Sequence, residues 1–289
     1  MLKIERRLLG FLEKHMLLLS ALLLSLMALY LRKTAVWWNY DNIGAYFDMH
    51  DNHTQTAAYY LLARLVQYLP LLPVHSVKWL AAISDFGIAG LVVYLLGKET
   101  DDRKKLVFYV VCLFSPVLFL RGIIWAQLDS TALILLLVGY VLHNNGQKSN
   151  RVRDWLAMAS VVGSIALCPY LFLILLFYLW QKAERKKDFW IQAAVIAAGG
   201  LLVQIVCALL VGEVWTDGLY SGIRFLTYHP ESGMRYEDAT EWILQMVYLY
   251  SPAAAVLTVL AAGKNRLSYK WTIGMQIVAT VLYGSVLFG

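Results

Sequence analysis

Long apolar runs recur through the whole chain, and they constrain the fold more than any other feature. The longest begin near residues 16, 77, 155, 189, 242 and 271. A run of about 18 or more apolar residues is typical of a helix that crosses a bilayer. Apolar residues make up 60% of the chain and charged residues 15%, against about half and about a quarter in a soluble domain. This apolar excess must face lipid.

We therefore predict an all-α fold, a polytopic transmembrane helix bundle of about nine spans. No hydrophilic stretch is long enough for a second domain, so residues 1–289 are expected to form one transmembrane domain. The predicted spans are residues 16–31, 77–96, 106–120, 130–141, 155–180, 189–211, 242–262 and 271–288. Residues 155–180 are expected to cross twice, because Cys168-Pro169 interrupts them and proline ends a helix. One long tilted span is the alternative.

The cations give the expected orientation. Lys and Arg number 4, 4, 3, 4 and 3 in residues 1–15, 97–105, 144–153, 181–188 and 263–270, which is 18 of the 25 in the chain. Alternating helices place all five segments on one side of the membrane. The positive-inside rule then predicts a cytoplasmic N-terminus in a multi-pass protein of the cell membrane.

Several classes of function lose support. The net charge of +6 follows from these loops, and no basic patch with interleaved aromatic residues predicts nucleic-acid binding. The three cysteines lie in apolar segments without disulfide or metal-ligand spacing. The sequence contains no P-loop, no GxGxxG and no HExxH motif.

The first predicted outer loop, residues 32–76, is acidic. It carries Asp41, Asp48 and Asp51. A carboxylate at the membrane surface can serve as a general base, and the same loop, with His50 and His53, could hold a divalent metal. A solvated loop is the alternative to a metal site.

Interfacial composition marks the two outer loops. Residues 56–69 of the first loop show helical apolar spacing through Tyr60, Leu61, Leu65 and Tyr68, which predicts an amphipathic helix along the membrane interface. The second large outer loop, about residues 212–241, combines aromatic residues with three basic side chains. These are Arg224, His229 and Arg235.

A short outer connection carries the most specific motif. Residues 115–137 read SPVLFLRGIIWAQLDSTALILLL. This segment resembles the Trp-Gly-Gln-x-Asp-Ser element of bacterial GT-C glycosyltransferases, integral membrane enzymes of the mannosyltransferase type that use polyprenyl-phosphate-linked sugars. The acidic first outer loop, the Asp85-bearing second span and the break at Cys168-Pro169 also resemble that family, over residues 1–180. Two positions depart from the pattern: Ala126 replaces the usual glycine and Cys168 the usual lysine.

The resemblance implies a GT-C-like fold and transfer of a sugar from a polyprenyl-phosphate donor to a glycan, lipid or protein acceptor on the outer face. It implies a catalytic Asp in the first outer loop, and we rank Asp41 before Asp48 and Asp51. The expected substrate-binding residues come from the outer connection and the second loop. They are Trp125, Gln127, Asp129, Arg121, Arg224, His229 and Arg235.

Simpler structural roles stand beside these functional ones. Asp129 begins an apolar helix and can cap it. Asp85 lies inside a span, where a carboxylate is costly unless it is paired, and Arg121 or Lys78 is the expected partner. Trp37 and Trp38 follow a span as an interfacial anchor would. Two other functions also remain open: a non-catalytic partner subunit, or a lipid or sugar transporter (flippase).

Overall fold

The structure is a computed structural model, and its helices confirm the all-α prediction for the part of the chain that it describes. It describes residues 3–37, 55–66, 68, 73–124, 126–144, 151–169, 171–172, 175–176, 179 and 185–224. Within these ranges no strand occurs. The helices are α1 (Lys3–Ala35), α2 (Ala57–Val66), α3 (Pro73–Leu95), α4 (Asp102–Leu113), α5 (Pro116–Phe119), the π-helix η2 (Leu120–Ile124), α6 (Asp129–Asn144), α7 (Arg151–Leu167), α9 (Lys186–Val211) and α10 (Trp215–Arg224).

Among the described helices, three are long and apolar enough to cross a membrane. The three segments are His15–Ala35, Val74–Leu95 and Lys186–Val211. At 1.5 Å per residue they measure about 32, 33 and 39 Å, against a hydrocarbon core of about 30 Å. The helices α4, α6 and α7 coincide with predicted spans but have 12, 16 and 17 residues. The predicted spans 242–262 and 271–288 lie outside the described residues, so a count of nine stays a prediction.

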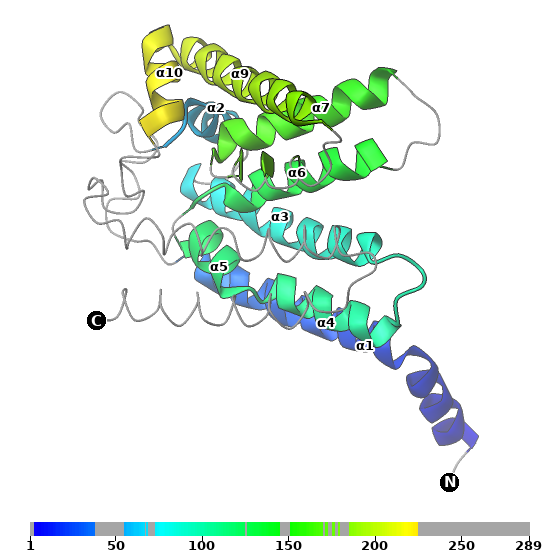
Figure 1. The fold of residues 1–289 in the computed structure, drawn as a ribbon. Helices are drawn as coiled ribbons and strands as arrows, with labels where there is room; N and C mark the ends of the chain where they lie inside the picture. Colours follow the sequence, from blue (N-terminus) through cyan, green and yellow to red (C-terminus); the bar gives the residue numbers. More distant parts are fainter. Residues whose placement is uncertain are drawn as a thin grey trace, which may run out of the picture.

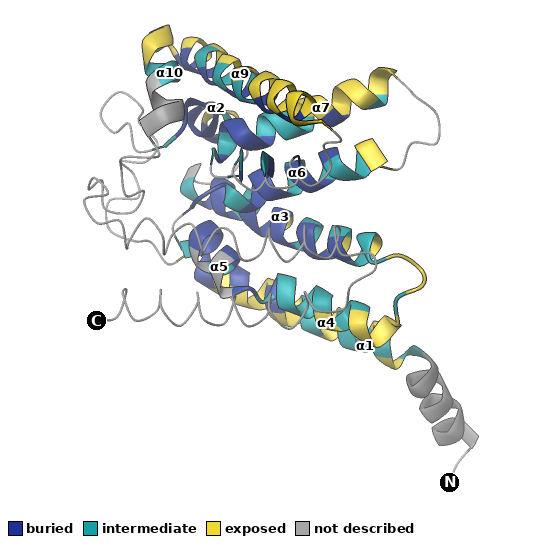
Figure 2. Ribbon diagram, in the orientation of Figure 1, coloured by how far each residue is buried: buried dark blue, intermediate teal, exposed yellow. Residues whose placement is uncertain are grey.

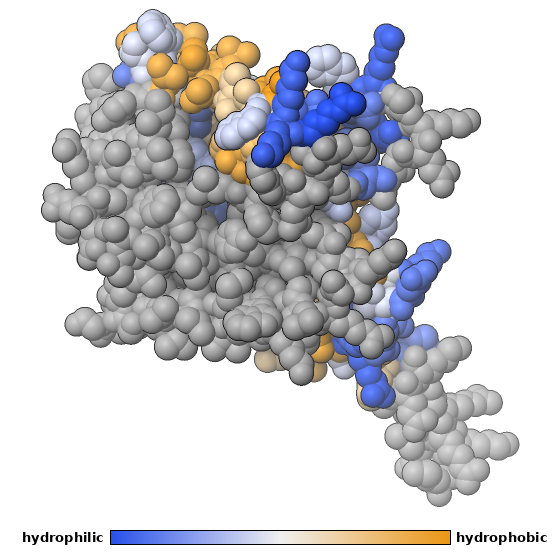
Figure 3. All heavy atoms as spheres, viewed as in Figure 1, coloured by the Kyte–Doolittle hydropathy of each residue, from blue (hydrophilic) through white to orange (hydrophobic). Residues whose placement is uncertain are grey.

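The longer helices form a row in which α3 runs opposite to α4 and α7 opposite to α6, whereas α1 and α4, α3 and α6, and α7 and α9 run in the same direction. Along this row α1 contacts α4, α4 contacts α3, and α6, α7 and α9 follow in turn (Figure 1). The connection 96–101 and the helix ends at Asn144, Arg151 and Lys186 lie at one end, which we call the basic end. Figure 3 shows hydrophilic side chains gathered there. The start of α6 lies at the opposite end, which we call the motif end.

The predicted break inside residues 155–180 is present. Helix α7 begins at the basic end and ends at Leu167, directly before Cys168-Pro169. Helix α9 begins at Lys186, again at the basic end (Figure 1). The chain therefore turns near Pro169 and returns to the end from which α7 started, as the basic loops predicted.

A few charged side chains lie inside the bundle, while several leucines of α1 and α9 face outward. Among the described residues, four charged residues expose at most 2% of their surface, and so does Gln204. The four are Arg32, Lys78, Asp85 and Arg121. Six leucines of α1 and α9 expose 56–68%: Leu18, Leu22, Leu23, Leu202, Leu209 and Leu210. Figure 2 shows the exposed faces of α1 and α9. Continuous apolar surface of this kind is costly in water and suits contact with lipid.

Helix α2 packs on the bundle through three alanines and through Tyr59 and Tyr60, which are 3% and 2% exposed. Ala57, Ala58 and Ala63 are buried, whereas Leu65 is 56% and Tyr68 89% exposed. Gln204 of α9 holds the start of α2, because its Oε1 accepts a hydrogen bond from the Ala58 amide at 3.1 Å. The predicted stripe is therefore divided, with Tyr60 inside the bundle and Leu65 and Tyr68 outside it. A position along the membrane interface stays a prediction.

Helix α10 packs closely on α9 at a glycine. A Cβ atom at Gly218 would lie 2.6 Å from the carbonyl oxygen of Gln204 and 2.7 Å from the Cα of Ile205. Backbone atoms cannot yield as a flexible side chain can. The contact between α9 and α10 therefore requires a residue without a side chain at position 218.

Gly218→Ala should lower the free energy of unfolding by about 1–3 kcal/mol, because the added methyl group forces α10 away from α9. Thermal unfolding of the purified protein in detergent measures the change. Gly90→Ala is the matched control, since a Cβ at Gly90 meets nothing within 4 Å. Equal stability of the two variants would show that α10 does not pack on α9 in this way.

The orientation is tested with single cysteines in a cysteine-free protein. Glu99 lies in the connection at the basic end and Thr216 at the start of α10, and both side chains are exposed. An impermeant thiol reagent added to intact cells should label Thr216→Cys and spare Glu99→Cys, because the basic end is expected in the cytoplasm. Labelling of Glu99→Cys alone would reverse the orientation.

Candidate functional site

Most residues of the predicted site lie outside the described residues. These are Asp41, Asp48, Asp51, Trp125, His229 and Arg235. Arg224 is the last residue of α10, and the structure does not describe its side chain. The structure describes Arg121, Gln127 and Asp129, and it brings these three together at the motif end.

The chain makes a tight turn between η2 and α6. The Gln127 amide donates a hydrogen bond to the Arg121 carbonyl at 2.8 Å, and the Tyr59 hydroxyl donates one to the Ala126 carbonyl at 2.9 Å. Gln127 and Ala126 are 4% and 1% exposed. The turn is thus closed on itself and tied to α2.

Ala126 adopts a left-handed backbone conformation, with φ at 53°. This conformation costs a residue with a Cβ about 1–2 kcal/mol, whereas glycine adopts it freely. Ala126 is the position at which the resembled motif has glycine. The turn therefore gives a physical reason for glycine at that position, and this chain keeps the turn with alanine.

Arg121 and Asp129 form an ion pair across this turn. The Arg121 Nε donates to the Asp129 Oδ2. The Arg121 side chain is 3% exposed and the Asp129 side chain 16%. Cys168, directly after α7, lies beside the Asp129 carboxylate. We call Arg121, Ala126, Gln127, Asp129 and Cys168 the α6 entrance.

The position at which the resembled family has a lysine therefore lies beside the motif's aspartate. In this chain Cys168 fills that position, and Arg121 supplies a cation to the same carboxylate. Asp129 is the first residue of α6, where a negative charge also interacts favourably with the helix dipole. Asp129 thus has a structural role, and its partly exposed side chain is still accessible to a ligand.

A second ion pair lies deeper in the bundle, between Arg32 of α1 and Asp85 of α3. The Arg32 Nε and Nη2 both donate to the Asp85 Oδ2, at 3.0 and 2.9 Å. The Ser130 hydroxyl of α6 donates to the other oxygen, Oδ1, at 2.5 Å. We call Arg32, Asp85 and Ser130 the core polar network, and it joins three helices.

The expected partners of Asp85 were wrong. Arg121 pairs with Asp129, and the Lys78 Nζ donates to the Val36 carbonyl at 3.3 Å. In the sequence, Arg32 directly follows the first predicted span, so it was expected to lie in the outer loop. It reaches Asp85 because α1 continues to Ala35 and carries Arg32 into the bundle.

Arg32 is held by further contacts that the sequence could not identify. Its Nη2 also donates to the Leu113 carbonyl at the end of α4, at 2.7 Å. Its guanidinium lies 5.6 Å from the ring centre of Phe86 and 5.8 Å from that of Phe119. A planar guanidinium can serve a carboxylate, a carbonyl and two rings at once, which lysine cannot.

Trp37 follows α1 and packs edge-on against His75 of α3, with ring centres 4.4 Å apart. Trp37 is 67% exposed and His75 is 5% exposed. An exposed indole at a helix end fits the anchor role expected for it. The ring contact also fixes the end of α1 beside the start of α3.

Within the described residues, no group of three or more His, Cys, Asp or Glu side chains could hold a metal ion. The proposed metal ligands around His50 and His53 lie outside those residues. No family model matches the chain. No curated protein and no solved structure matches it either.

Removing Asp85 should be costly. Asp85→Ala leaves the Arg32 guanidinium buried without its counter-ion and should lower the free energy of unfolding by about 3–5 kcal/mol. Ser130→Ala should cost about 1.5–3 kcal/mol, because it removes a hydrogen bond to a charged group. Denaturant titration in detergent measures both changes.

Asp102→Ala is the control for these variants. The Asp102 side chain is 73% exposed and pairs with Lys105 at the surface, so its loss should cost about 0–1 kcal/mol. A cost for Asp85→Ala as small as this would mean that the core polar network does not hold the helices together.

The left-handed turn predicts opposite effects of glycine at two buried alanines. Ala126→Gly should be at least as stable as the parent, by up to about 1 kcal/mol, because glycine relieves the backbone strain. Ala132→Gly, in the interior of α6, should lose about 1 kcal/mol or more. Thermal unfolding compares the two, and an equal loss in both would contradict the positive φ at Ala126.

Proposed function

We propose that the protein is a membrane glycosyltransferase. It moves a sugar from a polyprenyl-phosphate donor to a glycan, lipid or protein acceptor at the motif end of the bundle. The observation that carries this proposal is the α6 entrance: the segment resembling the GT-C motif holds Asp129 paired with Arg121 and still 16% exposed. It lies at the end opposite the basic loops, which is the expected outer face.

The proposed chemistry divides between the α6 entrance and the two outer loops. A carboxylate of the first outer loop, with Asp41 ranked first, takes the proton of the acceptor hydroxyl as the new C–O bond forms. Arg224 and Arg235 stabilise the charge that develops on the leaving phosphate. Asp129 accepts a hydrogen bond from a hydroxyl of the sugar, and Arg121 fixes the orientation of its carboxylate.

The contacts inside the described helices favour this proposal over a transporter. A transporter needs polar groups near the midplane that a substrate or ion can reach. The charged side chains inside α1 and α3 instead bond to the protein: Arg32 to Asp85, and Lys78 to the Val36 carbonyl. A non-catalytic partner subunit is the alternative, and the activity assay below distinguishes it from a glycosyltransferase.

Asp41→Asn keeps the shape of the side chain and removes the proton acceptor. A general base typically contributes about 10² to 10⁴-fold, so this variant should lose at least about a hundredfold in the rate of sugar transfer. The assay uses the purified protein with a synthetic polyprenyl-phosphate sugar and follows formation of the glycosylated acceptor. Binding of the donor lipid should persist in the variant.

Three comparisons interpret this assay. Asp102→Asn, at an exposed carboxylate of the basic end, should keep the parent rate. Loss of activity in Asp48→Asn or Asp51→Asn, with a normal rate in Asp41→Asn, would move the base to that residue. A parent protein that binds the donor but transfers no sugar to any acceptor would support the partner-subunit alternative instead.

A further inference from the structure

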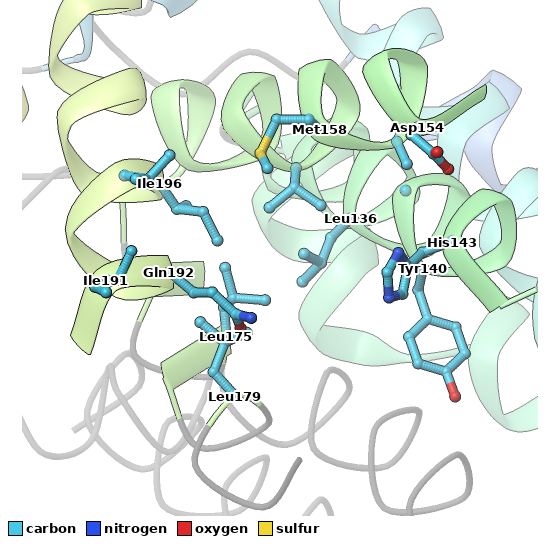
Figure 4. A pocket seen from close by; sticks show the side chains of 14 residues that line it. Leu136, Tyr140, His143, Asp154, Met158, Leu175, Leu179, Ile191, Gln192 and Ile196 are labelled. Carbon is cyan, nitrogen blue, oxygen red and sulfur yellow. The ribbon is translucent and has the colours of Figure 1, made fainter. Parts of the chain in front are cut away.

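A cavity of about 320 Å³ lies between α6, α7 and α9, near the basic end. This volume is at the small end of the range of about 300–1,000 Å³ for ligand pockets. Its lining is graded along the helices. His143 lies in the last turn of α6, Asp154 in the first turn of α7 and Gln192 in the second turn of α9, all toward the basic end, whereas Leu136 and Ile196 lie one to two turns further along their helices from that end (side chains in Figure 4).

The cavity opens sideways between α7 and α9. Met158, Ile191 and Val195 line it and are also 42%, 50% and 54% exposed, so they form its rim. Trp155 and Trp190 beside this rim are 74% and 65% exposed. The cavity thus opens on an apolar surface, and α9 is long enough to cross a membrane. Its natural neighbour is a lipid chain.

Cations stand at the helix starts that precede the lining residues Asp154 of α7 and Ile191 of α9. Helix α7 begins with Arg151 and Arg153, and helix α9 begins with Lys186 and Lys187. Arg153 pairs with Asp154 at 3.7 Å, which offsets the negative charge on the rim. Arg151 and both lysines are exposed. Each basic residue near a membrane surface contributes about 1 kcal/mol to the attraction of anionic lipids.

We propose that this cavity binds one anionic phospholipid. One acyl chain enters between Leu136, Val161 and Ile196, and the phosphate lies among the cations that begin α7 and α9. Clusters of cations beside an apolar gap between helices are a common arrangement for binding an anionic lipid head group. The apolar depth and the cationic rim together select a lipid over a free phosphate, which has no acyl chain.

This lipid site is distinct from the proposed catalytic site. His143 follows Asp129 by 14 residues along α6, which places the two about 21 Å apart. The lipid site lies at the basic end and the α6 entrance at the motif end. The proposal therefore does not depend on glycosyl transfer, and it holds for a partner subunit equally.

Native mass spectrometry of the full chain in detergent tests the proposal, with dioleoyl phosphatidylglycerol and dioleoyl phosphatidylcholine as probes. One phosphatidylglycerol should bind at least about tenfold more tightly than phosphatidylcholine. The exposed substitutions Lys186→Gln and Lys187→Gln, made together, should remove most of this preference without affecting folding. Glycerol phosphate added alone should not bind.

Val195→Trp fills the rim of the cavity and should weaken binding of both lipids at least about tenfold. Leu202→Trp is the matched control, because Leu202 lies two turns further along α9, is 61% exposed and does not line the cavity. It should bind phosphatidylglycerol as the parent does. Equal affinity for the two lipids in the parent, or equal binding by the Val195 and Leu202 variants, would overturn the proposal. Binding of glycerol phosphate as tight as that of phosphatidylglycerol would reduce the site to a phosphate site.

Discussion

The ion pair between Arg32 and Asp85 is the interaction on which the described part of the bundle depends. Two buried charges are expensive, and only close pairing with good hydrogen bonds compensates the loss of water. Here the pair lies at 2.9 Å, with both side chains at most 1% exposed. The Ser130 hydroxyl donates a hydrogen bond to the second oxygen of the Asp85 carboxylate, and the Leu113 carbonyl accepts one from the Arg32 guanidinium. One pair thereby ties α1, α3, α4 and α6 at a single level.

This tie extends to the proposed site because Ser130 is the neighbour of Asp129. The side chain of Ser130 points into the core polar network, while that of Asp129 pairs with Arg121 at the α6 entrance. The first turn of α6 is therefore fixed on two sides. A ligand-binding carboxylate gains from such support, because its orientation is set before the ligand arrives. The core polar network lies within an otherwise apolar interior. The exposed apolar faces of α1 and α9 suit lipid, and, as proposed above, one lipid enters the α6–α7–α9 cavity.

The sequence predicted what depends on local pattern. The apolar runs located α1, α3, α6 and α9, and Pro169 located the break after Leu167. The basic loops predicted that the helix ends which they connect lie at the same end of the bundle. The features that the sequence did not predict are contacts between residues that are far apart in the chain. Nothing in the local sequence shows that Arg32 reaches Asp85, 53 residues away, or that Arg121 turns to Asp129 instead. The sequence also did not predict that the alanines of α2 pack on the bundle, because alanine contributes little to an apolar pattern although its small side chain allows close packing.

The motif shows the same division between local and spatial information. The resemblance alone identified the segment around Asp129. The reason for a small residue at position 126 is visible only in the structure, where the φ angle of Ala126 is positive. The place of Cys168 beside Asp129 likewise required the fold. The loop carboxylates lie outside the described residues, and their role remains the proposal made from sequence.

A double-mutant cycle between Arg32 and Asp85 tests the central claim most directly. It compares the free energies of unfolding of the parent, Arg32→Met, Asp85→Leu and the double variant in detergent. We predict a coupling energy of about 2–3 kcal/mol, with the double variant much more stable than the two single losses imply, because it leaves no unpaired buried charge. Losses that add to within about 0.5 kcal/mol would contradict the account, since the two side chains would then not interact.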